Sequence, residues 1–166
     1  MSRAAALRFA AVLLLLLGLH FAVRPSLGDP RVAPDFVLVA VLFLAIRTRP
    51  AVGAAVGFLV GLALDALAPT AFGAAALAGT VVGYLAGWVK ALVFADNALM
   101  TALFVLAAAW LRDVIQTVSA NQLAGGALRW QLLVFSPLAA LTTAVAALVM
   151  LLVFRRWLGF RGGVAA

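Results

Sequence analysis

The sequence has no cysteine and no glutamate, and only 10% of its 166 residues are charged. The absence of cysteine excludes disulfides, thiol catalysis and metal sites built from thiolates. A single histidine, His20, excludes a catalytic histidine pair and a multi-histidine metal site within one chain. A soluble domain carries about 25% charged residues, so the shortage of charge also excludes an ordinary water-soluble enzyme.

Apolar residues, in contrast, make up 67% of the chain, and the mean hydropathy is +1.23. About 20 consecutive apolar residues cross the hydrocarbon core of a bilayer, so a chain of this length holds five or six crossings joined by short loops. We therefore predict an all-α fold: a polytopic membrane helical bundle with six transmembrane helices, forming a single integral membrane domain over residues 1–166.

Charges, prolines and polar runs divide the chain into six apolar stretches. The second stretch is short, so it can cross the membrane only if flanking residues extend the helix or if the bilayer is locally thinner. In a five-crossing alternative this stretch is re-entrant. The predicted helices lie near 7–23, 35–48, 51–68, 71–89, 92–115 and 132–154, and Lys90 lies in the break after the fourth.

The net charge of +7 would suggest a nucleic-acid partner in a soluble chain. Here the basic residues lie in short loops, so they are interpreted as determinants of topology, and no nucleic acid is expected. Six crossings from a cytoplasmic N-terminus place eight basic residues inside and four outside, which predicts that both termini are cytoplasmic. The inner set is Arg3, Arg8, Arg47, Arg49, Lys90, Arg155, Arg156 and Arg161, and the outer set is Arg24, Arg31, Arg112 and Arg129.

Glycines recur every fourth residue in the third and fourth stretches. This spacing lines them up along one ridge of a helix, where the missing side chains allow another backbone to come close. Two interpretations stay open: the third helix packs on the fourth, or a ridge docks the transmembrane helix of a partner. The residues are Gly53, Gly57 and Gly61, followed by Asp65, and then Gly79, Gly83 and Gly87.

A charge within hydrocarbon costs about 2.5 to 3.5 kcal/mol on insertion scales, so each one needs an explanation. Asp65 lies fourteen residues into its helix, about 21 Å from the helix start at 1.5 Å per residue. That depth predicts an interfacial carboxylate bonded to Thr70 or to the amides that open the next helix. A proton or ion pathway through Asp65 is the alternative.

Asp35 follows Pro34 and fits the first turn of the second helix. Arg112 and Asp113 lie late in the fifth helix, at the same membrane face as Asp35 and Asp65. We hypothesise that Asp65 or Asp35 forms a structural ion pair with Arg112 that holds helices together.

Sequence signatures of enzymes are missing. No serine lies in a G-x-S-x-G nucleophile elbow, and there is no G-x-x-x-x-G-K-[ST] phosphate loop. An intramembrane pair of Asp35 and Asp65 would lie at the wrong depth for a buried catalytic dyad. We therefore expect a packing and binding protein that is not an enzyme and uses neither a cofactor nor a metal.

The string Pro34-Asp35, then Gly57-Phe58-x-x-Gly61-Leu62-x-x-Asp65, then Gly73, resembles the MreD family of bacterial rod-shape-determining membrane proteins. The resemblance implies a non-enzymatic subunit of the cell-elongation machinery of the bacterial inner membrane, embedded in the lipid bilayer. It implies binding to the transmembrane helix of MreC, which links the subunit to RodA, to its penicillin-binding-protein synthase and to MreB filaments. The positions that the resemblance marks as important are Pro34, Asp35, Gly57, Gly61, Asp65 and Gly73.

The main alternative is a substrate-binding subunit of a vitamin-type transporter, because MreD proteins are similar in architecture to the substrate-binding subunits of energy-coupling-factor transporters. An outward cavity lined by Arg112, Asp65 and Trp110 would favour the transporter. A lipid-facing groove of small residues filled by a foreign helix would favour the scaffold. Trp110 is otherwise expected to be an outer interfacial anchor together with Trp130, and Trp88 an inner one.

Overall fold

The computed structural model describes residues 3–67, 71–93, 98–121 and 125–154. All regular structure within these ranges is helical, which confirms the predicted all-α class. In chain order the helices are α1 (Arg3–Ala22), the short 3-10 helix η1 (Arg24–Ser26), α2 (Phe36–Ala45), α3 (Pro50–Leu67), α4 (Ala74–Val93), α5 (Ala98–Ala120), α6 (Gly125–Trp130), the π-helical turn η3 (Gln131–Phe135) and α7 (Ser136–Phe154).

Four helical stretches of the described chain are long and apolar enough to cross a membrane. They are Ala6–Ser26, Pro50–Leu67, Leu99–Ala120 and Gly125–Phe154, while Phe36–Ala45 and Ala74–Val89 are shorter apolar helices. The ten residues of α2 extend over about 15 Å at 1.5 Å per residue. Six full crossings therefore stay a prediction.

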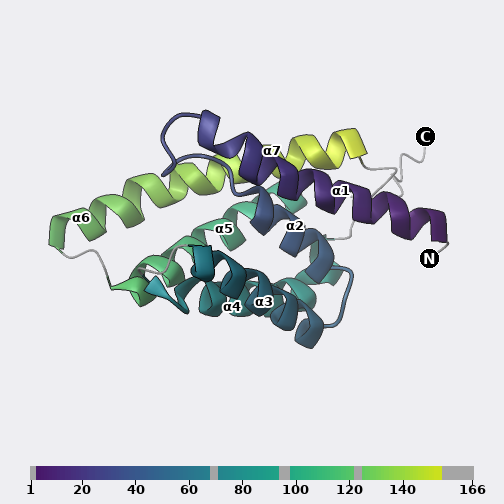
Figure 1. Ribbon diagram of the computed structural model, residues 1–166, viewed down its shortest axis with the longest axis horizontal. Coiled ribbons are helices and arrows are strands. Elements are labelled where there is room, and N and C mark those ends of the chain that lie inside the picture. Colours follow the sequence, from purple (N-terminus) through teal and green to yellow (C-terminus); the bar gives the residue numbers. More distant parts are fainter. Residues whose placement is uncertain (1–2, 68–70, 94–97, 122–124, 155–166) are drawn as a thin grey trace.

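The short helix α2 forms the centre of the bundle. It contacts α1, α3, α4, α5 and α7, and it lies between the layer of α1 and α7 and the layer of α3 and α4 (Figure 1). All of its residues except Leu44 are buried. A helix with neighbours on every side must be apolar on every side, which explains why the sequence Phe36–Ala45 has no polar residue.

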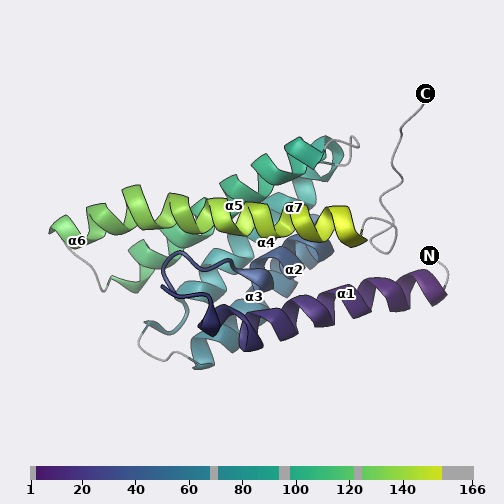
Figure 2. The same cartoon turned by 90° about the horizontal axis from the view of Figure 1, so that it is seen from above.

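Successive helices run in alternating directions along the bundle when the short α2 is included and α6, η3 and α7 are taken as one segment (Figures 1 and 2). As a result α1 begins and α7 ends at the same end of the molecule (Figures 1 and 2), which we call the proximal end. The opposite end, where α1, α3 and α5 terminate, is called the distal end. The helix α6 extends from the distal end beyond the rest of the bundle (Figure 2).

The helices α6 and α7 form one continuous helical segment that contains the π-helical turn η3. The amide of Ser136 donates to the carbonyl oxygen of Gln131, five residues earlier. Proline has no N–H and its ring crowds the carbonyl four residues earlier, so Pro137 disturbs the regular pattern here. A widened turn is a known way to absorb such a disturbance, and it lets the helix continue to Phe154.

Several predicted boundaries were wrong. The fourth helix was expected at 71–89, but α4 runs from Ala74 to Val93, because one lysine is compatible with a helix. The last helix was expected to begin at residue 132, but helix extends back to Gly125. The fifth helix, expected at 92–115, runs from Ala98 to Ala120. The predicted inner residues Arg155, Arg156 and Arg161 lie outside the described part of the chain.

Beyond Ala120 the chain leaves the helix at Asn121. Its φ of 48° lies in the left-handed region, which asparagine tolerates better than most residues. The polar residues from Gln116 to Ser119 are thus part of α5 and extend it past the apolar stretch on which the prediction rested.

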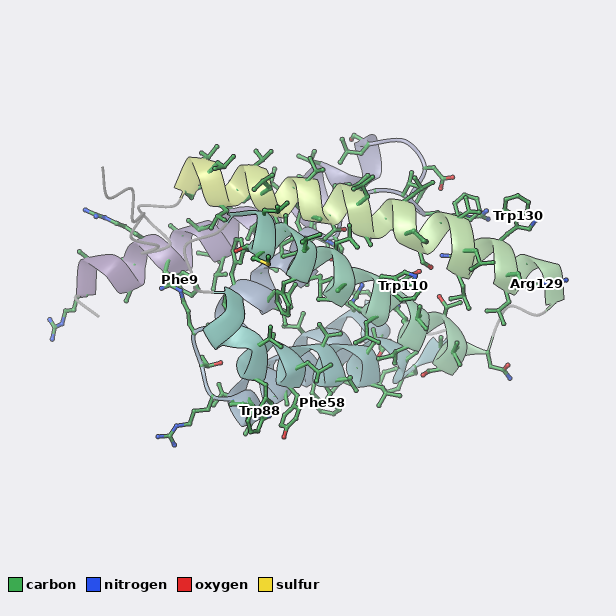
Figure 3. All side chains as sticks on the ribbon, turned by 180° about the vertical axis from the view of Figure 1, so that it is seen from behind. Phe9, Phe58, Trp88, Trp110, Arg129 and Trp130 are labelled. Atoms are coloured by element: carbon green, nitrogen blue, oxygen red, sulfur yellow. The ribbon has the colours of Figure 1, made fainter. Side chains whose placement is uncertain are left out.

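Exposed aromatic side chains lie toward both ends of the bundle. Trp88 and Phe58 lie on the outer surface of the α3 and α4 pair, and Trp130 lies on α6 at the opposite end (Figure 3). Trp110 is also exposed, and its indole N–H donates to the carbonyl oxygen of Leu132 at 3.4 Å. This distribution is typical of tryptophans that anchor a bundle at two membrane interfaces.

Candidate functional site

The first element of the site is Asp35, which caps the N-terminus of α2. Its Oδ1 accepts a hydrogen bond from the Leu38 amide at 3.0 Å, and its own amide donates to the Thr143 hydroxyl oxygen at 3.0 Å. Because α2 is so short, this cap lies inside the bundle, and the Asp35 side chain is only 12% exposed. The resemblance also marked Pro34, which is partly buried immediately before the cap.

Asp35 forms an ion pair with Arg112 of α5, in which Nη1 of the guanidinium contacts Oδ2. A buried charge is costly unless it is paired and hydrogen-bonded. The pair neutralises both groups and ties the start of α2 to α5. Our sequence hypothesis left Asp35 and Asp65 open as the partner of Arg112, and the geometry joins Arg112 to Asp35.

His20, near the end of α1, connects Asp35 with a second arginine. Its Nδ1 lies 3.4 Å from Asp35 Oδ1, and its Nε2 lies 3.5 Å from Nη1 of Arg24. The Val37 amide of α2 also donates to Nδ1, at 3.4 Å. The imidazole thus lies between the Asp35 carboxylate and the Arg24 guanidinium, and it ties the end of α1 to the first turn of α2.

Asp65 has a different role from Asp35, because it caps the next helix. It is buried near the end of α3, and it accepts the amides of Gly73, Ala75 and Ala76 at 3.0, 3.0 and 2.9 Å. These are amides that open α4, where the helix dipole also favours a negative charge. Gly73 has a φ of 97°, in the region that glycine adopts most readily. Thr70, the other partner considered, lies outside the described residues.

Asp113, the neighbour of Arg112, links α5 to the π-helical turn. The Ser136 hydroxyl donates to Asp113 Oδ2, and Nε2 of Gln131 lies 3.4 Å from the same oxygen. Ser136 is completely buried. The turn η3 therefore brings two polar groups of one helix onto a single carboxylate of another.

The acidic and basic side chains of this network line a hollow of about 500 Å³ at the distal end of the bundle. The recessed start of α2 forms part of its wall, because α1, α3 and α5 all continue past Asp35. A smaller cavity of about 90 Å³ adjoins the same group of residues and is lined by Asp35, Arg24, Arg112 and Asp113 among others. The residues that line the larger hollow are His20, Phe21, Arg24, Asp35, Leu64, Asp65, Leu67, Ala71, Ala75, Arg112, Asp113, Gln116, Thr117 and Ala120.

The glycine ridges lie away from this hollow, at the contact between α3 and α4. A Cβ added to Gly57 would lie 2.5 Å from the carbonyl carbon of Gly79, and one added to Gly83 would lie 2.8 Å from that of Gly53. The two backbones therefore touch, and no foreign helix fits between them. Further contacts of this kind join Gly61 to Ala75 and Gly87 to Pro50.

Sequence reasoning did not assign several residues of the polar network. His20 was considered only as a lone histidine, Arg24 was placed in the outer set of basic residues, and Ser136 was considered as a serine outside a nucleophile elbow. Gln131 was not considered. Thr143 was missed, although the pair Thr142-Thr143 interrupts an otherwise apolar helix. A polar pair within a long apolar run is the signal that could have revealed it, since such groups seek partners inside the bundle.

The network consists of carboxylates bonded to amides, hydroxyls and guanidinium groups. The described residues contain no group of three or more histidine, cysteine or acidic side chains placed to hold a metal ion. Every link described above joins one helix to another or fixes the start of a helix. The arrangement fits a structural and binding role.

Comparison with known families identifies the family of the chain. The sequence profile of rod shape-determining protein MreD matches residues 3–160, nearly the whole chain. The chain belongs to the MreD family. It is thus a rod-shape-determining membrane protein, of a family not known for enzymes.

Comparisons with curated proteins and with solved structures give no match. The expected similarity of this MreD protein to transporter subunits in architecture therefore stays a prediction. Arg112 and Asp65 line the hollow, but Trp110 does not, and its side chain is exposed on the surface of the bundle. The transporter alternative is not supported.

Proposed function

We propose that this MreD protein is a non-enzymatic adaptor subunit of the cell-elongation machinery in the bacterial inner membrane. In this role it binds the transmembrane helix of an MreC-type single-span protein, and through it the RodA and penicillin-binding-protein synthase and MreB. The single observation that carries the proposal is the family match over residues 3–160. The helix-to-helix links of the polar network support a structural role.

The surface proposed for the partner helix is the exposed face of α1. The glycine ridges of α3 and α4 pack against each other and leave no room for a partner helix. A docking face of small residues must therefore lie elsewhere. On α1 the buried stripe Phe9, Val12, Leu16 and His20 packs inward. The other side exposes Ala11, Leu15, Gly18 and Ala22, spaced by four, three and four residues. Spacing of this kind with small residues suits close packing of two membrane helices.

We further propose that the chain crosses the membrane six times with both termini in the cytoplasm. The alternating helix directions and the shared proximal end of α1 and α7 support it. Arg3, Arg8, Arg47 and Arg49 lie near the proximal helix ends, and Arg155 and Arg156 directly follow α7 in sequence. Cytoplasmic loops of membrane proteins carry an excess of such residues. The hollow then faces the outside of the cell.

The partner surface is tested by placing a leucine in the α1 face. A Cβ at Gly18 would meet nothing within 4 Å, so Gly18→Leu leaves the bundle intact. Co-purification of the MreC-type partner should fall by about tenfold or more if the face is used, because the added side chain separates the two backbones. The matched control is Ala107→Leu, at an exposed alanine on α5. Equal recovery of the partner with both variants would contradict the proposed surface.

A further inference from the structure

The charges in the distal hollow are not fully matched to one another. Within the described residues, ion pairs involve Asp35, with Arg112 and with His20. Asp65 is bonded to the three amides of α4, and Asp113 to Ser136 and Gln131. The hollow therefore contains carboxylates with no cation of their own.

Arg24, in the 3-10 helix after α1, is a cation that also lines the hollow. Its Nη1 lies 3.5 Å from His20, and its Nη2 donates to the Pro30 carbonyl at 3.5 Å, so both contacts are long. Its Nε is buried without a hydrogen-bond partner. A buried guanidinium N–H that lacks a partner costs free energy, and an anionic oxygen would satisfy it. Arginine binds phosphate and carboxylate oxygens well because its N–H groups form a planar fork.

The helix α5 adds neutral polar groups to the wall of the hollow. Gln116 and Thr117 follow Arg112 and Asp113 by four residues, so they lie on the same side of the helix one turn further toward the distal end. All four line the hollow. A ligand that enters from the distal end meets Gln116 and Thr117 first and the charged groups deeper in.

The rim of the hollow, in contrast, is apolar and exposed. Phe21 of α1 is 57% exposed and Leu67 of α3 is 69% exposed, and both line the opening. A small soluble ligand needs no such rim. A lipid does, because its acyl chains continue from the polar headgroup into the apolar phase.

We propose that the distal hollow binds the headgroup of a phospholipid that carries a phosphate and a primary ammonium, with the phosphate at Arg24 and the ammonium at Asp113. The volume of about 500 Å³ accommodates such a headgroup. The negative phosphate complements the positive charge of Arg24, and the positive ammonium complements the negative charge of Asp113. Phe21 and Leu67 contact the start of the acyl chains.

The primary ammonium is favoured over a quaternary one for a chemical reason. Carboxylates bind a primary ammonium through its N–H groups, whereas quaternary ammonium groups are recognised by cages of several aromatic rings. Among the described residues that line the hollow, the aromatic rings are those of Phe21, at the rim, and His20, too few to form such a cage. The hollow therefore suits phosphatidylethanolamine better than phosphatidylcholine.

The test measures lipid binding to the full chain by native mass spectrometry, with phosphatidylethanolamine, phosphatidylcholine and phosphatidylglycerol of identical acyl chains. The intact protein should bind phosphatidylethanolamine most tightly. Arg24→Gln should weaken its binding by about tenfold, the loss expected for a charge-assisted hydrogen bond. Arg129→Gln, at an exposed arginine on α6, is the matched control and should change nothing.

The second variant examines the ammonium side. Asp113→Asn keeps an oxygen that can accept from Ser136 but removes the negative charge, so it should abolish the preference over phosphatidylcholine. Asp29→Asn, in an exposed loop, is its control. Equal binding of the three lipids by the intact protein, or full binding by Arg24→Gln, would overturn the proposal. Free phosphoethanolamine that binds as tightly as the lipid would also overturn it, because the apolar rim would then contribute nothing.

Discussion

Gly57 of α3 and Gly79 of α4 face each other so closely that a Cβ on either one would collide with the backbone of the other. Two backbones in contact gain dispersion energy along their whole length, and this gain is a main source of helix association in lipid. The same closeness makes the contact intolerant of any added atom.

Gly57→Ala should therefore lower the stability of the protein. Overpacking of a tight contact costs about 1 to 3 kcal/mol, so the apparent melting temperature in detergent should fall by several degrees. Gly126→Ala is the control, because a Cβ there meets nothing within 4 Å. An unchanged melting temperature for Gly57→Ala would show that α3 and α4 do not pack as described.

Substitution of Asp65 should loosen the start of α4. Asp65→Ala removes the acceptor for three amides, and loss of even one capping interaction costs about 0.5 to 2 kcal/mol. Asp65→Asn retains one oxygen and should cost less than alanine. Amide hydrogen exchange measures this directly: the Ala75 and Ala76 amides should exchange faster in both variants, and protection equal to that of the unaltered protein would contradict the assignment.

The ion pair of Asp35 and Arg112 predicts a non-additive pair of substitutions. Removing one partner of a buried pair leaves a charge uncompensated and costs about 3 to 5 kcal/mol. Arg112→Gln and Asp35→Asn should each destabilise the bundle, and the double variant should be destabilised by less than the sum. A double-mutant cycle of detergent unfolding measures the coupling. Strict additivity would mean that the two charges do not interact.

The absence of cysteine allows a direct test of the proposed topology. A single cysteine in place of Ser26 or Arg49, both exposed, creates one labelling site each at opposite ends of the bundle. With an outward distal end, Ser26→Cys should react with an impermeant maleimide in intact cells. Arg49→Cys should react only after permeabilisation. The reverse pattern would invert the proposed orientation.

The sequence allowed the helical class to be predicted because hydropathy in a membrane protein reports directly on burial in lipid. The glycine and aspartate positions of α3 were also visible, because spacing by four places them on one face of a helix. The helix boundaries near Lys90 and Gln116 could not be predicted from the sequence, since a helix continues through polar residues wherever they reach water or an interface.

The pairing within the polar network was beyond sequence reasoning. Asp35 and Asp65 look alike in the sequence, since each is an acid near a helix end. Arg112 contacts Asp35 because α2 is short and its start is recessed, which only the packing of the bundle determines. Thr143 is likewise a partner of Asp35 through the tertiary fold, 108 residues away along the chain.

The glycine contact between α3 and α4 has a mechanical consequence. Most packed helices are separated by side chains, and small rotamer changes let one helix shift against the other. Here backbone lies on backbone, so the interface has almost no side chains with which to absorb a displacement. The two helices should therefore move as one rigid unit, and any bending of the bundle falls on contacts that side chains make elsewhere.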